Sequence, residues 1–282
     1  MVSLIHSMDT LTSQQQQLQL QYQGFIQTQP LWFGQLNNNL QQFGLMALQD
    51  SVPLHPQDAP KRLGNRVEYF VFQSLAQQAH IKILETNLQI QQDKQTLGEL
   101  DALLLVNNQP IHLEIIYKFY VYDPLVGTTD LEHWIGPNRK DSLVYKLDKL
   151  RNKQLPLLQA PETQPYLERH RLDSASIKQE VLFLAQLFVP RATATAVPFE
   201  QLNAKAVMGT YVRLPDLETY TTCSLYIPNK LDWLVLAHNT VSWQPYTLIK
   251  SQLEALLQTK RAPLIWMRHP DGQLERLFVV WW

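Results

Sequence analysis

The sequence predicts an α/β fold, a mixed sheet with helices on its faces, and three observations point to it. Hydrophobic residues make up 45% of the 282 residues, which is enough to bury a substantial core. Residues 58–160 follow the order helix, strand, hairpin, helix, and residues 161–282 are rich in strand-like segments. Residues 1–57 are rich in glutamine. We therefore expect a helical extension, an α/β core, and a β-rich part that is either a separate domain or continuous with the core.

The N-terminal extension is expected to form one or two helices followed by a loop at residues 52–60. Six of the eight residues from 14 to 21 are glutamine, which forms helices well. Leu18, Tyr22 and Phe25 recur near helical spacing. The alternative is a partly disordered polar leader.

The core is expected to begin with a helix that Asp58 caps, with Pro60 in its first turn. Apolar residues recur at helical spacing from Leu63 to Leu75 and would form one buried stripe. Three strand candidates follow, at residues 83–91, 99–106 and 111–120. A further helix is expected near the C-terminus, at residues 246–260.

The last two strand candidates of the core are joined by Asn107 and Asn108, which tolerate the positive φ of a tight turn. If these are the two loop residues, Asp101 lies directly opposite Glu114, with Cβ atoms about 4.5–5.5 Å apart. Two carboxylates so close are tolerated when one is protonated or when a cation lies between them. With oxygen ligands alone, that cation would be Mg²⁺ or Mn²⁺. The alternative is a slipped register, which would separate the acids and leave both in solvent.

A third carboxylate, Glu68, lies at the edge of the apolar stripe on the preceding helix. A helix that packs on the sheet would direct Glu68 toward the end of the sheet rather than into open water. The alternative is an ordinary solvated helix residue.

A second helix of the core is expected over about residues 139–153, with Asn138 as its cap. It carries six basic residues against two acidic ones, which creates a local positive patch on a chain whose formal net charge is −1. Those that fall within one narrow arc are Arg139, Lys146, Lys149 and Lys153. This face suits phosphate groups, and Trp134, in a loop, is expected to be exposed and to stack on a base. The alternatives are a solvated helix face and core packing of the aromatic residues.

The spacing of several residue types excludes classes of enzyme. No two of the nine glycines lie closer than nine positions, so neither G-x-G-x-x-G nor G-x-x-x-x-G-K-[ST] can occur. G-x-S-x-G and H-E-x-x-H are absent as well. The single cysteine, Cys223, cannot form an internal disulfide, which suits a reducing compartment. No run approaches the ~18 apolar residues of a membrane span, so we expect a cytoplasmic protein that does not enter a membrane.

Several of these segments resemble the core of the PD-(D/E)XK nuclease superfamily, whose members share a helix glutamate, a GE[IL]D strand and an E-x-K strand. The segments that carry the resemblance are RLGNRVE, ILETNLQI and GELDALLLVNNQPIHLEIIYKF, within roughly residues 58–153. The resemblance implies a restriction-endonuclease-like fold in which Asp101 and Glu114 bind Mg²⁺ or Mn²⁺ and Glu68 assists through a water.

More closely, the chain resembles a bacterial family catalogued as domain of unknown function 1853. The motifs that carry this resemblance are GELD, HxExxxKFY and GPNRKDxLxxKLxxLxxxQLPL. The similarity extends over most of the chain, including KLDWL and the C-terminal FVVWW. It implies a nuclease-like fold, in a family whose activity is not settled.

The chain departs from the superfamily pattern at the catalytic lysine, because Ile116 stands two residues after Glu114. Lys118 shares the strand face of Glu114, but its Cα is expected about 13 Å away, against about 7 Å for the usual spacing. Lys118 is the first candidate to orient or activate the attacking water. Lys146, on the second helix, is the second candidate, since some members recruit the lysine from there.

The sequence therefore predicts a metal-dependent nuclease, a hydrolase that cleaves DNA phosphodiester bonds. The alternative is a non-catalytic module on the same fold that binds nucleic acid or a protein, which Ile116 favours. A weaker alternative is a structural or assembly protein that uses the Gln-rich start and the aromatic C-terminus as contact surfaces. No oligomeric state is predicted.

Overall fold

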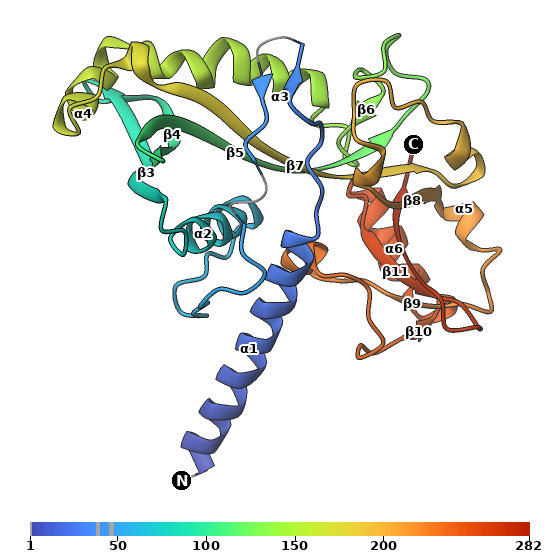
Figure 1. Cartoon of the computed structure of the whole chain (residues 1–282). Coiled ribbons are helices and arrows are strands. Elements are labelled where there is room, and N and C mark those ends of the chain that lie inside the picture. Colours follow the sequence, from blue (N-terminus) through green and yellow to red (C-terminus); the bar gives the residue numbers. More distant parts are fainter. Residues whose placement is uncertain (1, 38–39, 45–47) are drawn as a thin grey trace. The chain divides into compact units, whose positions relative to one another are not determined.

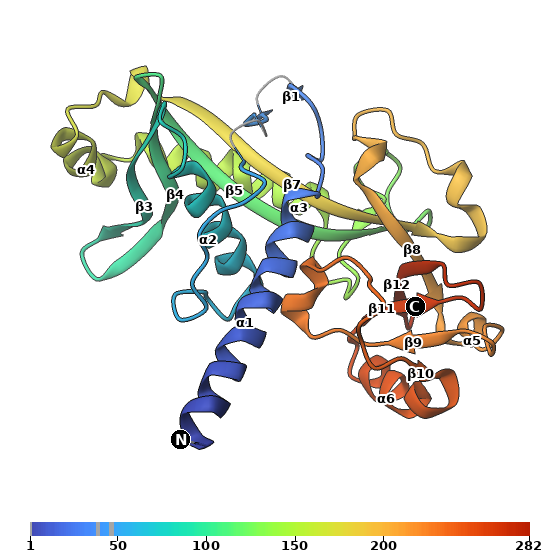
Figure 2. The same ribbon diagram turned by 60° about the horizontal axis from the view of Figure 1, so that its bottom comes forward.

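The computed structural model describes residues 2–37, 40–44 and 48–282, which form two compact units (Figures 1 and 2). Unit 1 comprises Met1–Ile26, Pro30–Tyr117 and Tyr145–Leu184, and unit 2 comprises Gln27–Gln29, Lys118–Val144 and Ala185–Trp282. The units are interleaved along the chain, whereas the sequence analysis expects three consecutive segments. Within the Gln-rich segment, residues 1, 38–39 and 45–47 lie outside the described part.

Unit 1 is built on strands in the order β3-β4-β5-β7. Their bounds are Ile81–Gln92 for β3, Gln95–Val106 for β4, Gln109–Tyr122 for β5 and Lys178–Pro190 for β7. The three strand candidates of the core are thus confirmed, each somewhat longer than expected. A separate two-stranded ladder joins β1 (Gln35–Leu36) to β2 (Leu40–Gln41).

The hairpin between β4 and β5 turns at Asn107 and Asn108, whose φ angles are 48° and 65°. Both residues are therefore left-handed, as a two-residue hairpin loop of this kind requires. The antiparallel ladder runs from Val106–Gln109 to Ala102–Leu113, which confirms the predicted register over these residues.

Helices α1 (Val2–Ile26) and α2 (Leu63–Leu75) pack together through aromatic rings. Tyr22 and Phe25 of α1 lie 5.3 and 5.6 Å, between ring centroids, from Phe70 of α2. Burial of this apolar surface stabilises two helices that are otherwise rich in polar residues. The helical prediction for the N-terminal extension is confirmed over α1.

The predicted start of α2 at Asp58 is wrong. Asp58 lies in a turn in which its N–H donates to the carbonyl of His55, and the helix begins at Leu63. The side chain of Arg66 donates to the carbonyl of Pro60 at 2.7 Å, so the segment before α2 is held by hydrogen bonds to the helix rather than by being part of it.

The second predicted helix begins at Leu143, later than the expected start near residue 139. It consists of α3 (Leu143–Lys149) and a π-helical turn (Leu150–Gln154), in which the N–H of Leu155 donates to the carbonyl of Leu150. Such a turn inserts one residue into the helix and is frequent at functional sites. Two 3₁₀ turns and α4 (Gln164–Arg169) follow. Figures 1 and 2 show α2 on one side of the unit 1 strands and the helix that contains α3 on the other.

The expectation that this helix starts at Arg139 with Asn138 as its cap is wrong. Arg139 has a φ of 53°, which is outside the right-handed helical region. The side chain of Asn138 instead accepts the N–H of Ala262 at 2.8 Å, so it stabilises a contact between two loops of unit 2.

The strands of unit 2 lie in the order β7-β8-β12-β11-β9-β10. β8 pairs in parallel with β7 and with β12, and the other neighbouring strands pair antiparallel. The sheet of unit 2 is therefore mixed. The bounds are Val207–Arg213 for β8, Ser224–Tyr226 for β9, Gln244–Pro245 for β10, Leu264–Arg268 for β11 and Leu274–Val280 for β12. The short β6 (Trp134–Ile135) pairs with β5.

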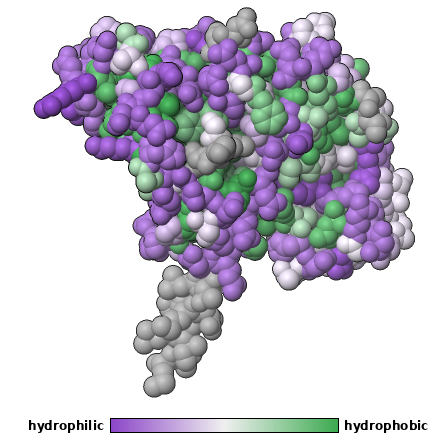
Figure 3. Space-filling model, in the orientation of Figure 1, coloured by the Kyte–Doolittle hydropathy of each residue, from purple (hydrophilic) through white to green (hydrophobic). Residues whose placement is uncertain are grey.

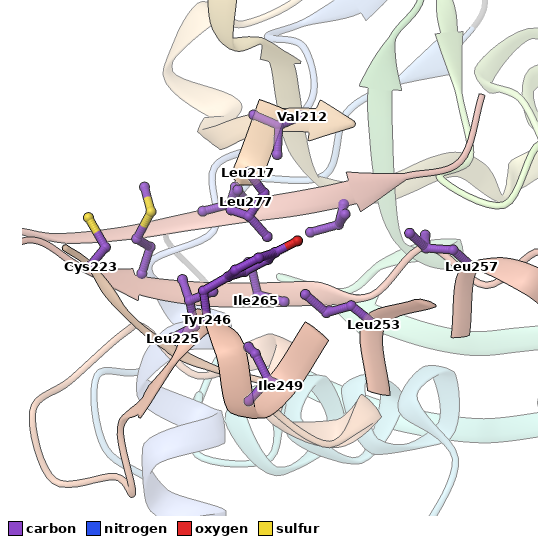
Figure 4. Packing of buried hydrophobic residues seen from close by; sticks show 12 residues of the cluster. Val212, Leu217, Cys223, Leu225, Tyr246, Ile249, Leu253, Leu257, Ile265 and Leu277 are labelled. Carbon is purple, nitrogen blue, oxygen red and sulfur yellow. The ribbon is translucent and has the colours of Figure 1, made fainter. Parts of the chain in front are cut away.

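Helix α6 (Tyr246–Gln258) confirms the helix predicted near the C-terminus, and α5 (Leu214–Leu217) is a single turn. Ile249 and Leu253 of α6 face Leu225 of β9 and Ile265 of β11, and together they form part of a closely packed apolar core (Figure 4). The predicted α/β class, a large mixed sheet flanked by helices, is thereby confirmed. Within residues 2–37, 40–44 and 48–282, no helix has the length and apolar character needed to cross a membrane.

Candidate functional site

Three carboxyl groups of unit 1 come from different elements: Glu68 from α2, Asp101 from β4 and Glu114 from β5. Glu68 is half-buried, whereas Asp101 and Glu114 are only 9% and 0% exposed. The β4–β5 ladder ends at Ala102–Leu113, so Asp101 and Glu114 follow immediately after it, one on each strand. Since neither acid faces solvent, the slipped register considered above is excluded.

The carboxylate of Asp101 takes the place of a backbone partner where the ladder ends. Its Oδ2 accepts the N–H of Ile115 at 2.7 Å, and this hydrogen bond stabilises the charged form. A hydrogen bond from the backbone of Asp101 in turn stabilises the charged form of Glu114. The two acids therefore hold the two strands together through reciprocal contacts at this point.

Glu114 is held by two further side chains. Its Oε1 lies 3.2 Å from His112 Nε2, and its Oε2 accepts a hydrogen bond from Gln154 Nε2. Gln179 Nε2 donates to His112 Nδ1 at 3.0 Å, so His112 carries its proton on Nε2 and donates it to Glu114. Burial lowers the pKa of His112 to about 4, so this ring is neutral at pH 7.

The acids are poorly compensated electrostatically. Burial, followed by the charges of Asp101 and Glu99, raises the pKa of Glu68 to about 7. Burial and the charge of Glu114 raise the pKa of Asp101 to about 7. Burial raises the pKa of Glu114 to about 8, although Lys146 and Lys149 oppose that shift. Part of the cluster therefore holds protons at neutral pH.

Lys146 and Gln154 connect the helix that contains α3 to the acids. Lys146 is half-buried, and its Nζ donates to Gln154 Oε1 at 2.6 Å, while the amide nitrogen of Gln154 donates to Glu114. Gln154 is therefore a bridge between a lysine and a carboxylate. Gln154 is not among the site residues predicted from the sequence; the one sequence signal for it is its place as the glutamine of the motif QLPL.

Two of the carboxylates, those of Asp101 and Glu114, fit a divalent cation in some respects and not in others. Across the described part of the chain, no group of three or more His, Cys, Asp and Glu side chains is arranged to hold a metal ion. Mg²⁺, however, is commonly bound by one or two carboxylates and keeps several waters. The carboxylate of Glu114 accepts hydrogen bonds from His112, Gln154 and the backbone of Asp101, which leaves only part of its lone pairs available. The donor set of Asp101 and Glu114 is therefore compatible with Mg²⁺ or Mn²⁺ bound by two protein ligands.

The chain matches the family described as Domain of unknown function (DUF1853) over residues 3–280. The chain belongs to this family. No curated protein and no solved structure matches it. The family match covers both units, so it includes the acid cluster of unit 1 as well as the β-rich unit 2.

The two lysine candidates in this DUF1853 member have different partners. Lys118 lies on the part of β5 that belongs to unit 2, and its Nζ pairs with Asp141. The lysines whose charges act on the pKa of Glu114 are Lys146 and Lys149. Lys146 is therefore the candidate that is connected to Glu114, through Gln154, and the catalytic role of either lysine stays a prediction. Ile116, at the usual lysine position, is 3% exposed.

The predicted arc of four basic residues is not formed. Arg139 donates to Asp123 at 2.7 Å and stacks on Trp282, all within unit 2. Lys146 turns inward to Gln154, which leaves Lys149 and Lys153 as the exposed members.

The expectation that Trp134 is exposed is wrong. Its side chain is 0% exposed and packs edge-on against Tyr122, with ring centroids 5.3 Å apart. Phe199, 65 positions further along the chain, covers it from another element at 5.7 Å. Trp134 is a core residue of unit 2 and is not available to stack on a base.

Proposed function

We propose that unit 1 of this DUF1853 member is a nuclease that hydrolyses DNA phosphodiester bonds with Mg²⁺ or Mn²⁺. The observation that supports it is the grouping of Glu68, Asp101 and Glu114, whose pKa values burial raises to about 7, 7 and 8. Keeping three such groups together costs stability, and that cost is typical of functional sites. The resemblance to the PD-(D/E)XK core, in which these positions are the site acids, supports the same proposal.

Asp101 and Glu114 would hold the cation, and Glu68 would accept a hydrogen bond from a water in its coordination shell. When bound, such an ion lowers the pKa of a water molecule and neutralises charge on a phosphate. His112 and Gln154 both donate to Glu114 and keep its carboxylate in one orientation. Supporting hydrogen bonds of this kind fix the orientation of a metal-binding side chain and strengthen its affinity for the ion.

Lys146 is the lysine that this proposal places at the reaction. Its Nζ is held by Gln154, which also contacts Glu114, so a phosphate next to Glu114 would lie near its positive charge. A fixed ammonium in a partly buried site stabilises the negative charge that builds up on the phosphoryl oxygens. Lys118, which is paired with Asp141, has no role in this proposal.

The test is the conversion of supercoiled plasmid to nicked and linear forms with Mg²⁺ or Mn²⁺. We expect cleavage by the wild type, and its loss in Asp101→Ala and in Lys146→Met. The matched control is Asp93→Asn, because Asp93 is an exposed acid in the turn between β3 and β4. Cleavage that persists in both Asp101→Ala and Lys146→Met would refute the assignment of these residues.

Binding of the cation is measured separately from cleavage. We expect Mn²⁺ to raise the thermal midpoint of the wild type and of Asp93→Asn, but not of Asp101→Ala. A midpoint that Mn²⁺ raises equally in all three proteins would place the ion elsewhere.

A second candidate, a non-catalytic nucleic-acid-binding module, is favoured by one specific observation. Glu114 is 0% exposed and both of its oxygens already accept hydrogen bonds, while Ile116 fills the usual lysine position. A protein of this kind would retain DNA in a salt-sensitive manner without cleaving it under any divalent cation. Retention should then be lost when Lys149 and Lys153 are both replaced by glutamate.

A further inference from the structure

The helix that contains α3 exposes an aromatic residue beside its basic residues. Tyr145 is 65% exposed, and Lys149 follows it by four positions, so the two side chains are neighbours on the helix surface. Leu143, Leu147 and Leu150 are buried and attach the opposite face of the helix to the protein. The face with Tyr145 and Lys149 is thus turned to solvent.

A second lysine is exposed in the π-helical turn that follows α3. Lys153 and its neighbour Asn152 are exposed, while Gln154, the next residue, is directed to Glu114. The residues exposed along this stretch therefore supply an aromatic ring, two ammonium groups, an amide and one carboxylate, that of Asp148. In the orientation of Figure 1, Figure 3 shows mainly hydrophilic side chains over α3 and α4 of unit 1.

This face adjoins the acid cluster along the helix. Gln154, the residue next to Lys153, donates to Glu114 and accepts a hydrogen bond from Lys146 Nζ at 2.6 Å. A phosphate bound at Lys153 would therefore be close to the position where the proposed chemistry takes place.

We infer that the face formed by Tyr145, Lys149 and Lys153 binds single-stranded or locally unpaired nucleic acid, with one base stacked on the Tyr145 ring. The inference rests on the proposed function, because it names the substrate class of the same site. The charge of the lysines is complementary to phosphates, and an exposed ring offers a surface to any unpaired base. In an intact duplex the bases are stacked on one another, so the ring would contribute nothing to binding.

The experiment measures binding of a fluorescent oligothymidine and of a duplex of the same length, in EDTA so that no cleavage occurs. We expect Tyr145→Ala to weaken single-strand binding about tenfold and to leave duplex binding unchanged. Tyr145→Phe, which keeps the ring, should bind as the wild type does. The control is Leu125→Ala, because Leu125 is an 86% exposed apolar residue in unit 2.

The lysines are tested in the same assay. Lys149→Glu with Lys153→Glu should weaken binding of both oligonucleotides and reduce the salt dependence, whereas Lys82→Glu, at an exposed position of β3, should not. The inference is overturned if the wild type binds neither oligonucleotide, if Tyr145→Ala binds the single strand normally, or if it loses both substrates equally.

The outcomes separate this inference from the nuclease proposal. Ring-dependent binding of the single strand without any cleavage in Mn²⁺ would support the inference and refute the nuclease. Cleavage that depends on Asp101, combined with normal single-strand binding by Tyr145→Ala, would support the nuclease proposal and refute the inference about Tyr145.

Discussion

The buried charges of the two units are compensated in different ways. In unit 2, Glu275 accepts two hydrogen bonds from Arg191 and lies 3.0 Å from His269 Nε2. Burial raises the pKa of Glu275, but the hydrogen bond and charge of Arg191 outweigh it, so the net shift is downward. In unit 1, burial and like charges raise the pKa values of Glu68 and Asp101.

This difference is the one expected between a structural use of charge and a functional one. A carboxylate that is paired with an arginine contributes to folding, because its charged form is stabilised in the folded state. A group of acids that repel one another lowers stability and persists where it serves binding or chemistry. We therefore expect substitutions in the two units to change stability in opposite directions.

The largest effect is expected at Arg191. Replacing it by alanine leaves Glu275 partly buried without its two charge-assisted hydrogen bonds, and should lower the free energy of unfolding by about 1–3 kcal/mol. Urea denaturation at pH 7 measures this.

The matched control is Lys250→Ala, because Lys250 pairs with Glu218 in solvent. The Lys250 side chain is 42% exposed and the Glu218 side chain 48%. A solvated pair of this kind contributes about 0–1 kcal/mol. If both substitutions had the same effect, Arg191 would not be a structural cation of unit 2, and the contrast between the units would fail.

A smaller effect of opposite sign is expected for Asp101→Asn. The pKa of Asp101 is raised from 3.8 to about 7, so the folded state holds its proton more tightly than the unfolded state does. That contribution to stability is fully present below the ordinary pKa of 3.8 and is lost as the pH rises from there through about 7. The variant lacks this loss, so its stability relative to the wild type should increase between about pH 5.5 and pH 7, by up to about 1.4 kcal/mol per pH unit, and should level off above pH 7, where both states have lost the proton.

Comparing the variant with the wild type at each pH cancels the titration of other groups, such as Lys230, whose pKa burial lowers to about 7. Asp93→Asn should show no such pH dependence. With saturating Mn²⁺ the advantage of Asp101→Asn should shrink, since a bound cation offsets the repulsion. A difference that does not vary with pH would contradict the raised pKa.

Those parts of the site that depend on local sequence were predictable. Asn107 and Asn108 fix the turn, the turn fixes the register, and the register brings Asp101 and Glu114 to the same end of the ladder. Each step needs only neighbouring residues and the two-residue period of a strand.

The errors arose where distant contacts or an irregular turn decide the outcome. Trp134 has loop-like neighbours, yet Tyr122 and Phe199 cover it, and no local pattern reveals that. The predicted arc of basic residues failed because Arg139 lies before the helix and bonds to Asp123, and because the side chain of Lys146 turns inward to Gln154. Gln154 lies in a π-helical turn, which no local sequence pattern predicts, and its side chain contacts both Lys146 and Glu114.

The smallest expected effect, and the most specific test of the bridge, is that of Gln154→Ala. Removing the amide should lower the free energy of unfolding by only about 0.5–1.5 kcal/mol. It should also raise the pKa of Glu114 further, because a donor that stabilises the carboxylate is lost. Carbon-13 NMR titration of the glutamate carboxyl groups measures this shift, and the pH profile of plasmid cleavage should move in the same direction. Gln159→Ala, at an exposed glutamine on the following 3₁₀ turn, is the control. If Gln154→Ala lowered stability but left the titration of Glu114 unchanged, Gln154 would be a packing residue, and Lys146 would have no defined path to the acids.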